Sequence, residues 1–354
     1  MLEKIKFYQT GSKTVGNRLL NPSMRSNQAS VDRPNSLISG HRACQGCGEA
    51  LGARYAIDAA MRATGGQVMI SNATGCLEVF STPYPESAWR LPWIHTLFGN
   101  AAAVGSGLAA AAQVRAKRNG DTVVPRVIAQ GGDGGTTDIG MGCLSGMFDR
   151  NDDVLYICYD NEAYMNTGVQ RSSATPPSAR TATTMPVGEK PGADWGRGKD
   201  VPLIAMAHGI PYVATATIAD LRDLEAKVAK AMTFHGARYI NILVPCPLGW
   251  GLKSSALTVT AARLAMETGF FPVFEAEYGK ITSVRKIQQK QPVENYLKIQ
   301  KRYAHVVKKG ADPNTLARLQ ALCDTNIKNF GLLGDDEPQL NPTAIVAYER
   351  SKSI

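Results

Sequence analysis

The sequence predicts an α/β protein built on an open, mostly parallel sheet with helices on both faces. Short apolar runs of strand type alternate with segments that carry apolar residues at helical spacing. Residues that carry chemistry gather where these runs end, which is where parallel sheets bind their ligands. An extended N-terminal arm precedes this region and a helical C-terminal tail follows it.

The composition is that of a chain with a large buried core. It has 354 residues, of which 44% are hydrophobic and 19% are charged. No uncharged apolar run reaches about 18 residues, and residues 1–6 lack the apolar core of a signal peptide. We therefore expect a cytoplasmic protein without a membrane span. Seven cysteines in such a chain favour thiol ligands or buried thiols over a disulfide framework.

The net charge of +9 is unevenly distributed along the chain. Residues 1–40 hold six Lys or Arg against two acidic residues, and residues 285–310 hold eight against Glu294. No recognition-helix motif and no aromatic residues interleaved with the basic ones accompany this excess, so it does not indicate nucleic-acid binding. We expect it to face an acidic protein, either a partner subunit or an electron carrier. A solvated basic face is the alternative.

Three segments are expected along the chain. Residues 1–39 form a basic arm, residues 40–255 a ligand-binding domain, and residues 256–354 a C-terminal extension. The arm is polar and rich in Ser, Asn and Arg, so it cannot form a core of its own. The extension is more polar and basic than the domain before it, and we interpret it as helical.

The middle domain is expected to alternate strands and helices. Strands are predicted over residues 67–70, 124–130, 154–159, 210–217 and 239–244, and helices over residues 51–61, 100–117, 137–148 and from the capping Asp220 to near Gly236. Residues 83–93, dense in Pro, Tyr and Trp, and residues 167–199 are expected to be loops. Either loop could line a pocket or pack against a cofactor or a partner.

A glycine turn after the strand at 124–130 is the first candidate site. Gly131-Gly132-Asp133-Gly134-Gly135 joins a strand to a helix, where main-chain amides without β-carbons in front of them can meet an anion. Asp133 adds a hard oxygen, and Asn161 adds another at the end of the strand at 154–159. Two such strand ends suit a diphosphate with Mg2+. An ordinary strand-turn-helix connection with a capping Asp is the alternative.

Four cysteines in loops or at strand ends form the second candidate site. They are Cys44, Cys47, Cys76 and Cys246. A close pair of thiols with two distant ones can hold zinc or an iron–sulfur cluster, and a Cys-Pro dipeptide is a feature of bacterial cluster sequences. The spacing alone does not choose between these metals. The remaining cysteines are expected to behave as small core residues; they are Cys143, Cys158 and Cys323.

Five motifs in this order resemble the β subunit of pyruvate:ferredoxin oxidoreductase and related 2-oxoacid:acceptor oxidoreductases. They are residues 40–49, 73–80, 132–134, 159–175 and 245–247, and the resemblance spans roughly residues 38–310. It implies the thiamine diphosphate-binding fold, thiamine diphosphate (TPP) with Mg2+, one [4Fe–4S] cluster, and coenzyme A as co-substrate. The implied reaction is oxidative decarboxylation of a 2-oxo acid, with pyruvate the leading candidate, to acyl-CoA and CO2. Electrons would pass through the cluster to ferredoxin or a similar acceptor.

The resemblance also implies roles for single residues. The cluster ligands would be Cys44, Cys47, Cys76 and Cys246. Mg2+ would be bound by the side chains of Asp133 and Asn161 and by the carbonyl of Ala163. The residues expected to contact the cofactor are Gly132, Gly134 and Gly135 at the diphosphate, with Glu49, Cys76 and Glu162 elsewhere. Asn166 would lie beside the thiazolium and the substrate as the catalytic residue.

The chain is expected to contribute half of an active site. In the resembled family, the carboxylate that activates the cofactor belongs to a partner α chain or domain, so we assign no acid of this chain to that role. Further γ and δ subunits or domains are implied as well. The arm before Gly40 and the tail beyond about residue 310 depart from the best-known members, which leaves the subunit arrangement and the substrate open.

Alternatives remain for both the substrate and the class of protein. Related enzymes act on phenylglyoxylate or on branched 2-oxo acids. A non-oxidative TPP decarboxylase in which the four thiols bind structural zinc is a second interpretation. A non-catalytic binding protein that keeps only the glycine turn is a third.

Overall fold

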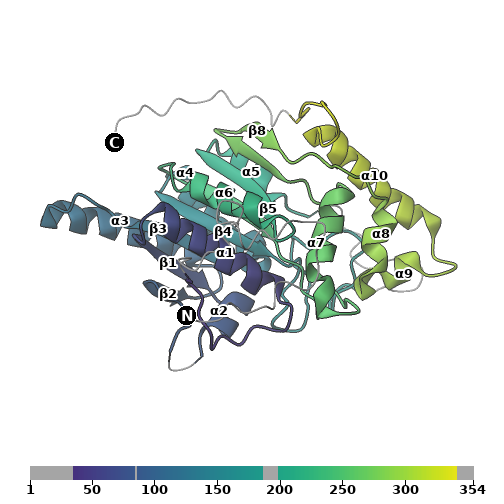
Figure 1. Cartoon of the computed structure of the whole chain (residues 1–354), viewed down its shortest axis with the longest axis horizontal. Coiled ribbons are helices and arrows are strands. Elements are labelled where there is room, and N and C mark those ends of the chain that lie inside the picture. The colour runs from purple at the N-terminus through teal and green to yellow at the C-terminus, as the bar shows by residue number, and fades with distance from the viewer. Residues whose placement is uncertain (1–34, 84–85, 186–197, 341–354) are drawn as a thin grey trace, which may run out of the picture. The chain divides into compact units, whose positions relative to one another are not determined.

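The computed structural model describes residues 35–83, 86–185 and 198–340 (Figure 1). The chain divides into two compact units, Met1–Asn35 and Ser36–Ile354. The predicted arm over residues 1–39 therefore falls almost entirely outside the described residues. The architecture that follows is that of the second unit.

An eight-stranded sheet forms the centre of this unit, in the order β2-β1-β3-β4-β6-β5-β7-β8. Its strands are β1 (Val68–Ala73), β2 (Trp93–Thr96), β3 (Arg126–Gly132), β4 (Val154–Asp160), β5 (Tyr212–Thr217), β6 (Arg238–Leu243), β7 (Phe274–Glu277) and β8 (Lys280–Val284). The strands from β2 to β5 in this order are all parallel, and β7 and β8 join in antiparallel pairs. The sheet is therefore mostly parallel, as predicted.

Helices cover both faces of the sheet (Figure 1). They are α1 (Gly48–Ala63), α2 (Cys76–Ser81), α3 (Ala101–Asn119), α4 (Met141–Asp149), α5 (Val201–Ala207), α6 (Leu221–Ala231), α7 (Thr258–Glu267), α8 (Val293–Lys298), α9 (Ala304–Val307) and α10 (Pro313–Phe330). Helices α1 and α6 pack on one face, and α3, α4 and α5 pack on the other. Strand β4 supplies Leu155 and Ile157 to the first layer and Tyr156 and Cys158 to the second, so it is apolar throughout.

The predicted strands and helices of the middle domain are present, with ends shifted by a few residues. Four short features were not predicted: β2, α2, α5 and the β7–β8 hairpin. Strand β2 has only four residues and follows a Pro-rich stretch, and α5 carries a proline in its first turn. The hairpin lies in the segment interpreted as helical, and it turns through Tyr278 and Gly279, both with positive φ.

The helix predicted over residues 137–148 is divided into two parts. A π-helical stretch, Gly134–Ile139, follows Asp133, and α4 begins only at Met141. Widened turns of this kind occur often at functional sites, because they change the direction in which main-chain groups point. Here the wide turn begins at the glycines of the first candidate site.

The order of the strands reverses between β1 and β3. The chain passes from β1 to β2 on one side and then returns to β3 on the other side of β1. Helix α1 precedes β1 on one face and α3 precedes β3 on the opposite face. Ligands of open parallel sheets bind outside the carboxyl ends of the strands at such a reversal.

The C-terminal segment packs as a third apolar cluster beside the sheet. Its buried residues include Trp250, Tyr296, Tyr303 and Leu319, and Figure 1 shows α8, α9 and α10 grouped together. None of the described helices combines the length and the apolar character that a membrane span requires.

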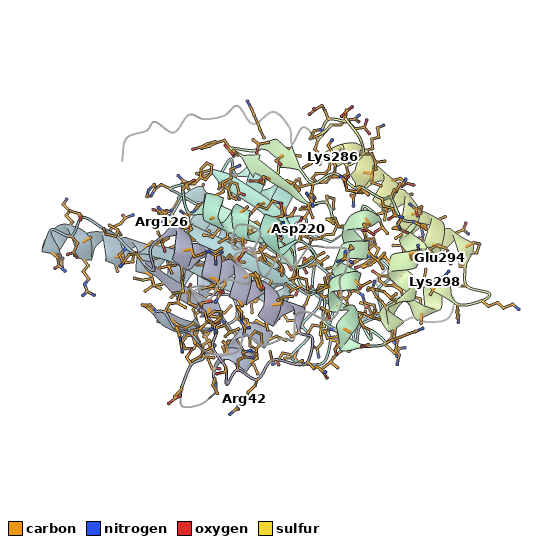
Figure 2. All side chains as sticks on the ribbon, in the orientation of Figure 1. Arg42, Arg126, Asp220, Lys286, Glu294 and Lys298 are labelled. Carbon is orange, nitrogen blue, oxygen red and sulfur yellow. The ribbon has the colours of Figure 1, made fainter. Side chains whose placement is uncertain are left out.

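The basic excess over residues 285–310 is partly neutralised within the chain. Four of its eight basic residues lie within 3 Å of a carboxylate oxygen: Arg285 of Asp220, Lys290 of Asp324, Lys298 of Glu294, and Arg302 of Glu162. Figure 2 labels Glu294 and Lys298 on α8. The surface that this stretch presents is therefore less basic than its composition indicates.

Gly48 has no room for a side chain. A β-carbon there would lie 2.6 Å from the carbonyl oxygen of Pro245. We predict that Gly48→Ala lowers the free energy of unfolding by about 2 kcal/mol, because main chain must move to admit the methyl group. Gly107→Ala in α3 is the matched control: nothing lies within 4 Å of its added β-carbon, so it should gain up to about 1 kcal/mol. Urea denaturation of both variants checks this, and equal effects would contradict it.

Candidate active site

Four adjacent parallel strands end side by side, and a predicted site residue follows each of them. In the register, Gly132 of β3 pairs with Tyr159 of β4, and Asp160 of β4 pairs with Leu243 of β6. The residues beyond the strand ends are Cys76 after β1, Asp133 after β3, Asn161 after β4 and Cys246 after β6. They therefore follow one another along one edge of the sheet.

Helix α1 brings two more predicted residues to this edge. Cys47 caps the helix, and its Sγ accepts a hydrogen bond from the main-chain nitrogen of Ala50 at 3.4 Å. Glu49 in the first turn is 3% exposed, and its Oε2 accepts a hydrogen bond from Asn161 Nδ2 at 3.2 Å. Burial raises the pKa of Glu49 to about 8, against hydrogen bonds from Asn161 and the Leu77 main chain.

The four candidate thiols share one neighbourhood. Gly48 packs against Pro245, which places the loop of Cys44 and Cys47 beside Cys246. Burial raises the pKa of the Cys76 thiol, and Glu49 and the other three thiols raise it further. Burial and Glu49 likewise raise the pKa of Cys47 to about 12. Across residues 35–83, 86–185 and 198–340, no three His, Cys, Asp or Glu side chains converge closely enough to hold a single metal ion.

The other three cysteines lie away from this group. Cys158 in β4 and Cys323 in α10 are fully buried, as predicted for core residues, and Cys143 in α4 is partly buried.

Two carboxylates, Asp133 and Asp160, are buried at this edge of the sheet, and their contacts within the chain offset little of the cost of ionising them. Asp133 is 1% exposed, and its Oδ2 accepts a hydrogen bond from Ser172 Oγ at 2.5 Å. Burial and the neighbouring Asp160 hold the pKa of Asp133 well above its usual range. Burial and Glu162 raise the pKa of Asp160 to about 7. A cation placed here would remove the cost of ionising both groups.

Asn161 has one buried polar atom without a partner. Its Nδ2 donates to Glu49, and its main-chain oxygen accepts from Trp250 Nε1 at 2.8 Å. Its Oδ1 is buried and makes no hydrogen bond. Leaving a buried amide oxygen unsatisfied costs about 1–3 kcal/mol, and a divalent cation with oxygen ligands would satisfy it. Asp133 and Asn161 therefore fit the Mg2+ that the sequence implies.

The glycine turn serves packing as well as ligand access. A β-carbon at Gly134 would lie 2.3 Å from the ring of Tyr164, and one at Gly135 would lie 2.9 Å from the carbonyl oxygen of Phe98. At Gly132 the nearest atom would be 4.0 Å away, so this position is open. Gly132 fits the predicted approach of a diphosphate, whereas Gly134 and Gly135 are also required by their neighbours.

The remaining predicted residues lie in the turn and loop after β4. Glu162 has a positive φ of 67°, and its carboxylate accepts a hydrogen bond from Arg302 rather than facing open space. Ala163 is buried. Asn166 is exposed, in a turn closed by a hydrogen bond from Tyr164 N to the Gln170 carbonyl. Its catalytic role remains a prediction.

Sequence reasoning missed four residues that shape the site: Tyr164, Ser172, Trp250 and Arg302. Ser172 lies in the loop at 167–185, after the turn that carries Asn161, and could have been noticed as a polar partner for Asp133. Trp250 lies four residues after Cys246. Arg302 carried no local signal, because it lies 140 residues from Glu162 in sequence.

Comparison with known proteins identifies the class. Residues 73–242 match the family described as thiamine pyrophosphate enzyme, C-terminal TPP binding domain. The sheet, its carboxyl edge and this match define a domain of the thiamine pyrophosphate-dependent enzymes. A solved 2-oxoglutarate:ferredoxin oxidoreductase from Magnetococcus marinus is similar, with a TM-score of 0.48 and 22% identity, covering 80% of this chain and 94% of that chain.

Sequence relatives define the family more narrowly. The chain is 47% identical to pyruvate synthase subunit PorB of Methanosarcina barkeri over 84% of this chain and 97% of that subunit. It is 41% identical to ketoisovalerate oxidoreductase subunit VorB of Pyrococcus abyssi over 77% of this chain and 86% of that subunit. The chain belongs to the family of 2-oxoacid oxidoreductase β subunits that includes PorB. The resemblance drawn from the five motifs is confirmed.

Glu49 should make the stability of the cofactor-free chain depend on pH. Its pKa lies near 4.5 when unperturbed and at about 8 in the folded chain. Because the folded chain keeps a proton that the unfolded chain releases, the free energy of unfolding falls as the pH rises from 4.5 to 8. We predict that Glu49→Gln removes this contribution, with a gain on the order of 3 kcal/mol at pH 8 and little change at pH 4.5.

Denaturation by urea at several pH values measures this difference. Glu294→Gln on the exposed face of α8 is the control and should follow the wild-type profile. A Glu49→Gln variant that keeps the wild-type pH dependence would show that Glu49 is ionised in the folded chain.

Proposed function

We propose that this chain is the β subunit of a pyruvate:ferredoxin oxidoreductase, which converts pyruvate and coenzyme A to acetyl-CoA and CO2 and passes the two electrons released to ferredoxin. The observation that carries the proposal is the row of Cys76, Asp133, Asn161 and Cys246 along the ends of β1, β3, β4 and β6. One edge of the sheet thus offers oxygen ligands and thiols side by side. Family membership and the PorB name of the relatives support pyruvate as the substrate.

Asp133 and Asn161 would hold Mg2+ with the carbonyl of Ala163, and the main chain at Gly132 would meet the diphosphate. The unpartnered Asn161 Oδ1 and the buried Asp133 carboxylate support this assignment. Bound TPP supplies an electron sink for the decarboxylation of a 2-oxo acid. Glu49 and Cys76 would contact the cofactor, and Asn166 would lie beside the substrate.

Cys44, Cys47, Cys76 and Cys246 would hold a [4Fe–4S] cluster. A zinc ion requires all four sulfurs about 2.3 Å from one point, whereas each thiolate of a cluster binds a different iron. The charges of the other three thiols raise the pKa of Cys76, which supports a shared site for the four. Membership of a family whose resemblance implies a cluster favours a cluster over zinc, with ferredoxin or a similar protein as the final acceptor.

A partner α subunit would complete the site. The acidic side chains near the edge are engaged within the chain: Glu49 with Asn161, Glu162 with Arg302, and Glu78 with Thr82. The resemblance to this family leaves the carboxylate that activates the cofactor to the partner. The names of the relatives, which are subunits, support an assembly of this kind.

Metal content tests the cluster directly. We predict that the anaerobically purified chain is brown and contains about four iron and four sulfide per chain. Cys246→Ala should lose the visible absorbance, because one of four ligands is removed. Cys143→Ala, from α4, is the matched control and should keep it. A colourless chain with one zinc would contradict the cluster.

Substrate use tests the whole proposal. The chain assembled with its partner subunits should reduce an artificial dye with pyruvate and coenzyme A. Its kcat/KM should exceed that for 3-methyl-2-oxobutanoate by about tenfold or more, since a pocket shaped for a methyl group excludes a branched one. The chain alone should be inactive. Full activity without the partner would refute the proposal that this chain supplies only half of the active site. A preference for the branched acid would refute pyruvate as the substrate.

A further inference from the structure

The turn after β4 has an unusual main-chain shape, which is closed from within by a hydrogen bond from Glu162 N to Asp160 Oδ1 at 2.9 Å. Glu162 lies between Asn161 and Ala163 with φ at 67°, in the left-handed region. Residues with side chains seldom adopt this conformation, and it persists only where surrounding contacts enforce it. This turn would present both Asn161 and Ala163 to Mg2+. The contacts that enforce its shape therefore set the geometry of that site.

Arg302 makes the closest of these contacts. It lies in the 3-10 turn Lys301–Tyr303, and its Nη2 donates to Glu162 Oε2 at 2.5 Å. The two side chains are only 4% and 6% exposed, so water does not compete for the pair. Nε of Arg302 donates to Gln300 Oε1 at 2.7 Å, and Nη2 also donates to Tyr296 OH at 3.3 Å. The guanidinium is thus fixed by its own segment.

Trp250 connects Arg302 to Asn161. The centre of its ring lies 3.7 Å from the guanidinium carbon of Arg302, a cation–π contact. The Nε1 of Trp250 donates to the main-chain oxygen of Asn161 at 2.8 Å. Arg302 therefore holds Glu162 directly and orients the residue that holds Asn161. We call Glu162, Trp250, Tyr296, Gln300 and Arg302 the Arg302 clamp.

The clamp also reaches the loop that follows Asn166. The main-chain oxygen of Arg302 accepts a hydrogen bond from Arg180 N at 3.0 Å. One residue of the C-terminal segment thus contacts both the metal-binding turn and the end of the loop at 167–185.

We propose that Arg302 is a positioning residue that holds the turn at 160–163 in its metal-binding shape and thereby sets the affinity for Mg2+. It acts through Glu162 and Trp250. This inference rests on the proposed function, because the Mg2+ site at Asn161 is part of it. The shape of the turn itself can be measured without any cofactor.

The test compares Arg302→Met with Arg238→Met. Arg238 is equally buried and pairs with Asp153 at 3.0 Å, but it lies at the start of β6, away from the carboxyl edge. Two quantities are measured: amide hydrogen exchange of peptides spanning residues 160–165 in the cofactor-free chain, and the Mg2+ concentration for half-saturation of TPP binding. The second uses calorimetry on the assembled complex without a 2-oxo acid.

Arg302→Met should raise the exchange rate of these amides and the half-saturating Mg2+ concentration by about tenfold or more, as expected for loss of a partner that orients metal ligands. Arg238→Met should destabilise the chain, yet leave both within about twofold of wild type. Arg302→Met values within twofold of wild type would overturn the proposal. Equal changes in the two variants would also overturn it, since general destabilisation would then explain them.

Two milder variants keep the proposal open to refutation if Arg302→Met does not fold. Arg302→Lys keeps the charge, and Trp250→Phe removes only the donor to Asn161. Each should raise the Mg2+ requirement about threefold or more, and no change in either would overturn the clamp. A wild-type complex that binds no TPP would instead refute the proposed function, while hydrogen exchange still decides the role of Arg302.

Discussion

The parallel register of β1, β3, β4 and β6 is the constraint on which the rest of the site depends. Parallel strands end at the same edge, so residues far apart in sequence become neighbours only if the strands are in register. A shift of one residue in β4 would turn Asn161 to the opposite face of the sheet. Strand cores that are buried on both faces prevent such a shift, because every alternative register buries different side chains.

The edge that results is electrostatically costly for the cofactor-free chain. Asp133, Asp160 and Glu49 are buried together, and burial raises the pKa of each. The unpartnered Oδ1 of Asn161 adds a further cost. These groups stabilise the fold little by themselves. All of them carry oxygen atoms that a nearby cation would stabilise. The site is thus organised around a ligand more than around its own stability.

The sequence predicted the fold class and the residues at the strand ends, because both depend on local patterns. Apolar runs marked β3, β4 and β6, and the glycines and Asp133 followed one of them. The β7–β8 hairpin escaped prediction because its strands, of four and five residues, lie in a polar segment. The same limit applies within the site: Ser172 and Arg302 contact Asp133 and Glu162 only after the chain has folded. Asn161 could be found from its strand, but the contacts that orient it could not.

Trp250 forms hydrogen bonds with residues of both candidate sites, the four thiols and the glycine-turn edge. Its main-chain nitrogen donates to the Cys246 carbonyl at 2.9 Å, and its indole nitrogen donates to the Asn161 carbonyl at 2.8 Å. In the same loop, Gly249 N donates to Cys246 Sγ at 3.2 Å. One fully buried ring therefore links the loop of Cys246 to the turn of Asn161. The C-terminal segment packs around Trp250 and Arg302, so it supports both the loop of Cys246 and the turn of Asn161.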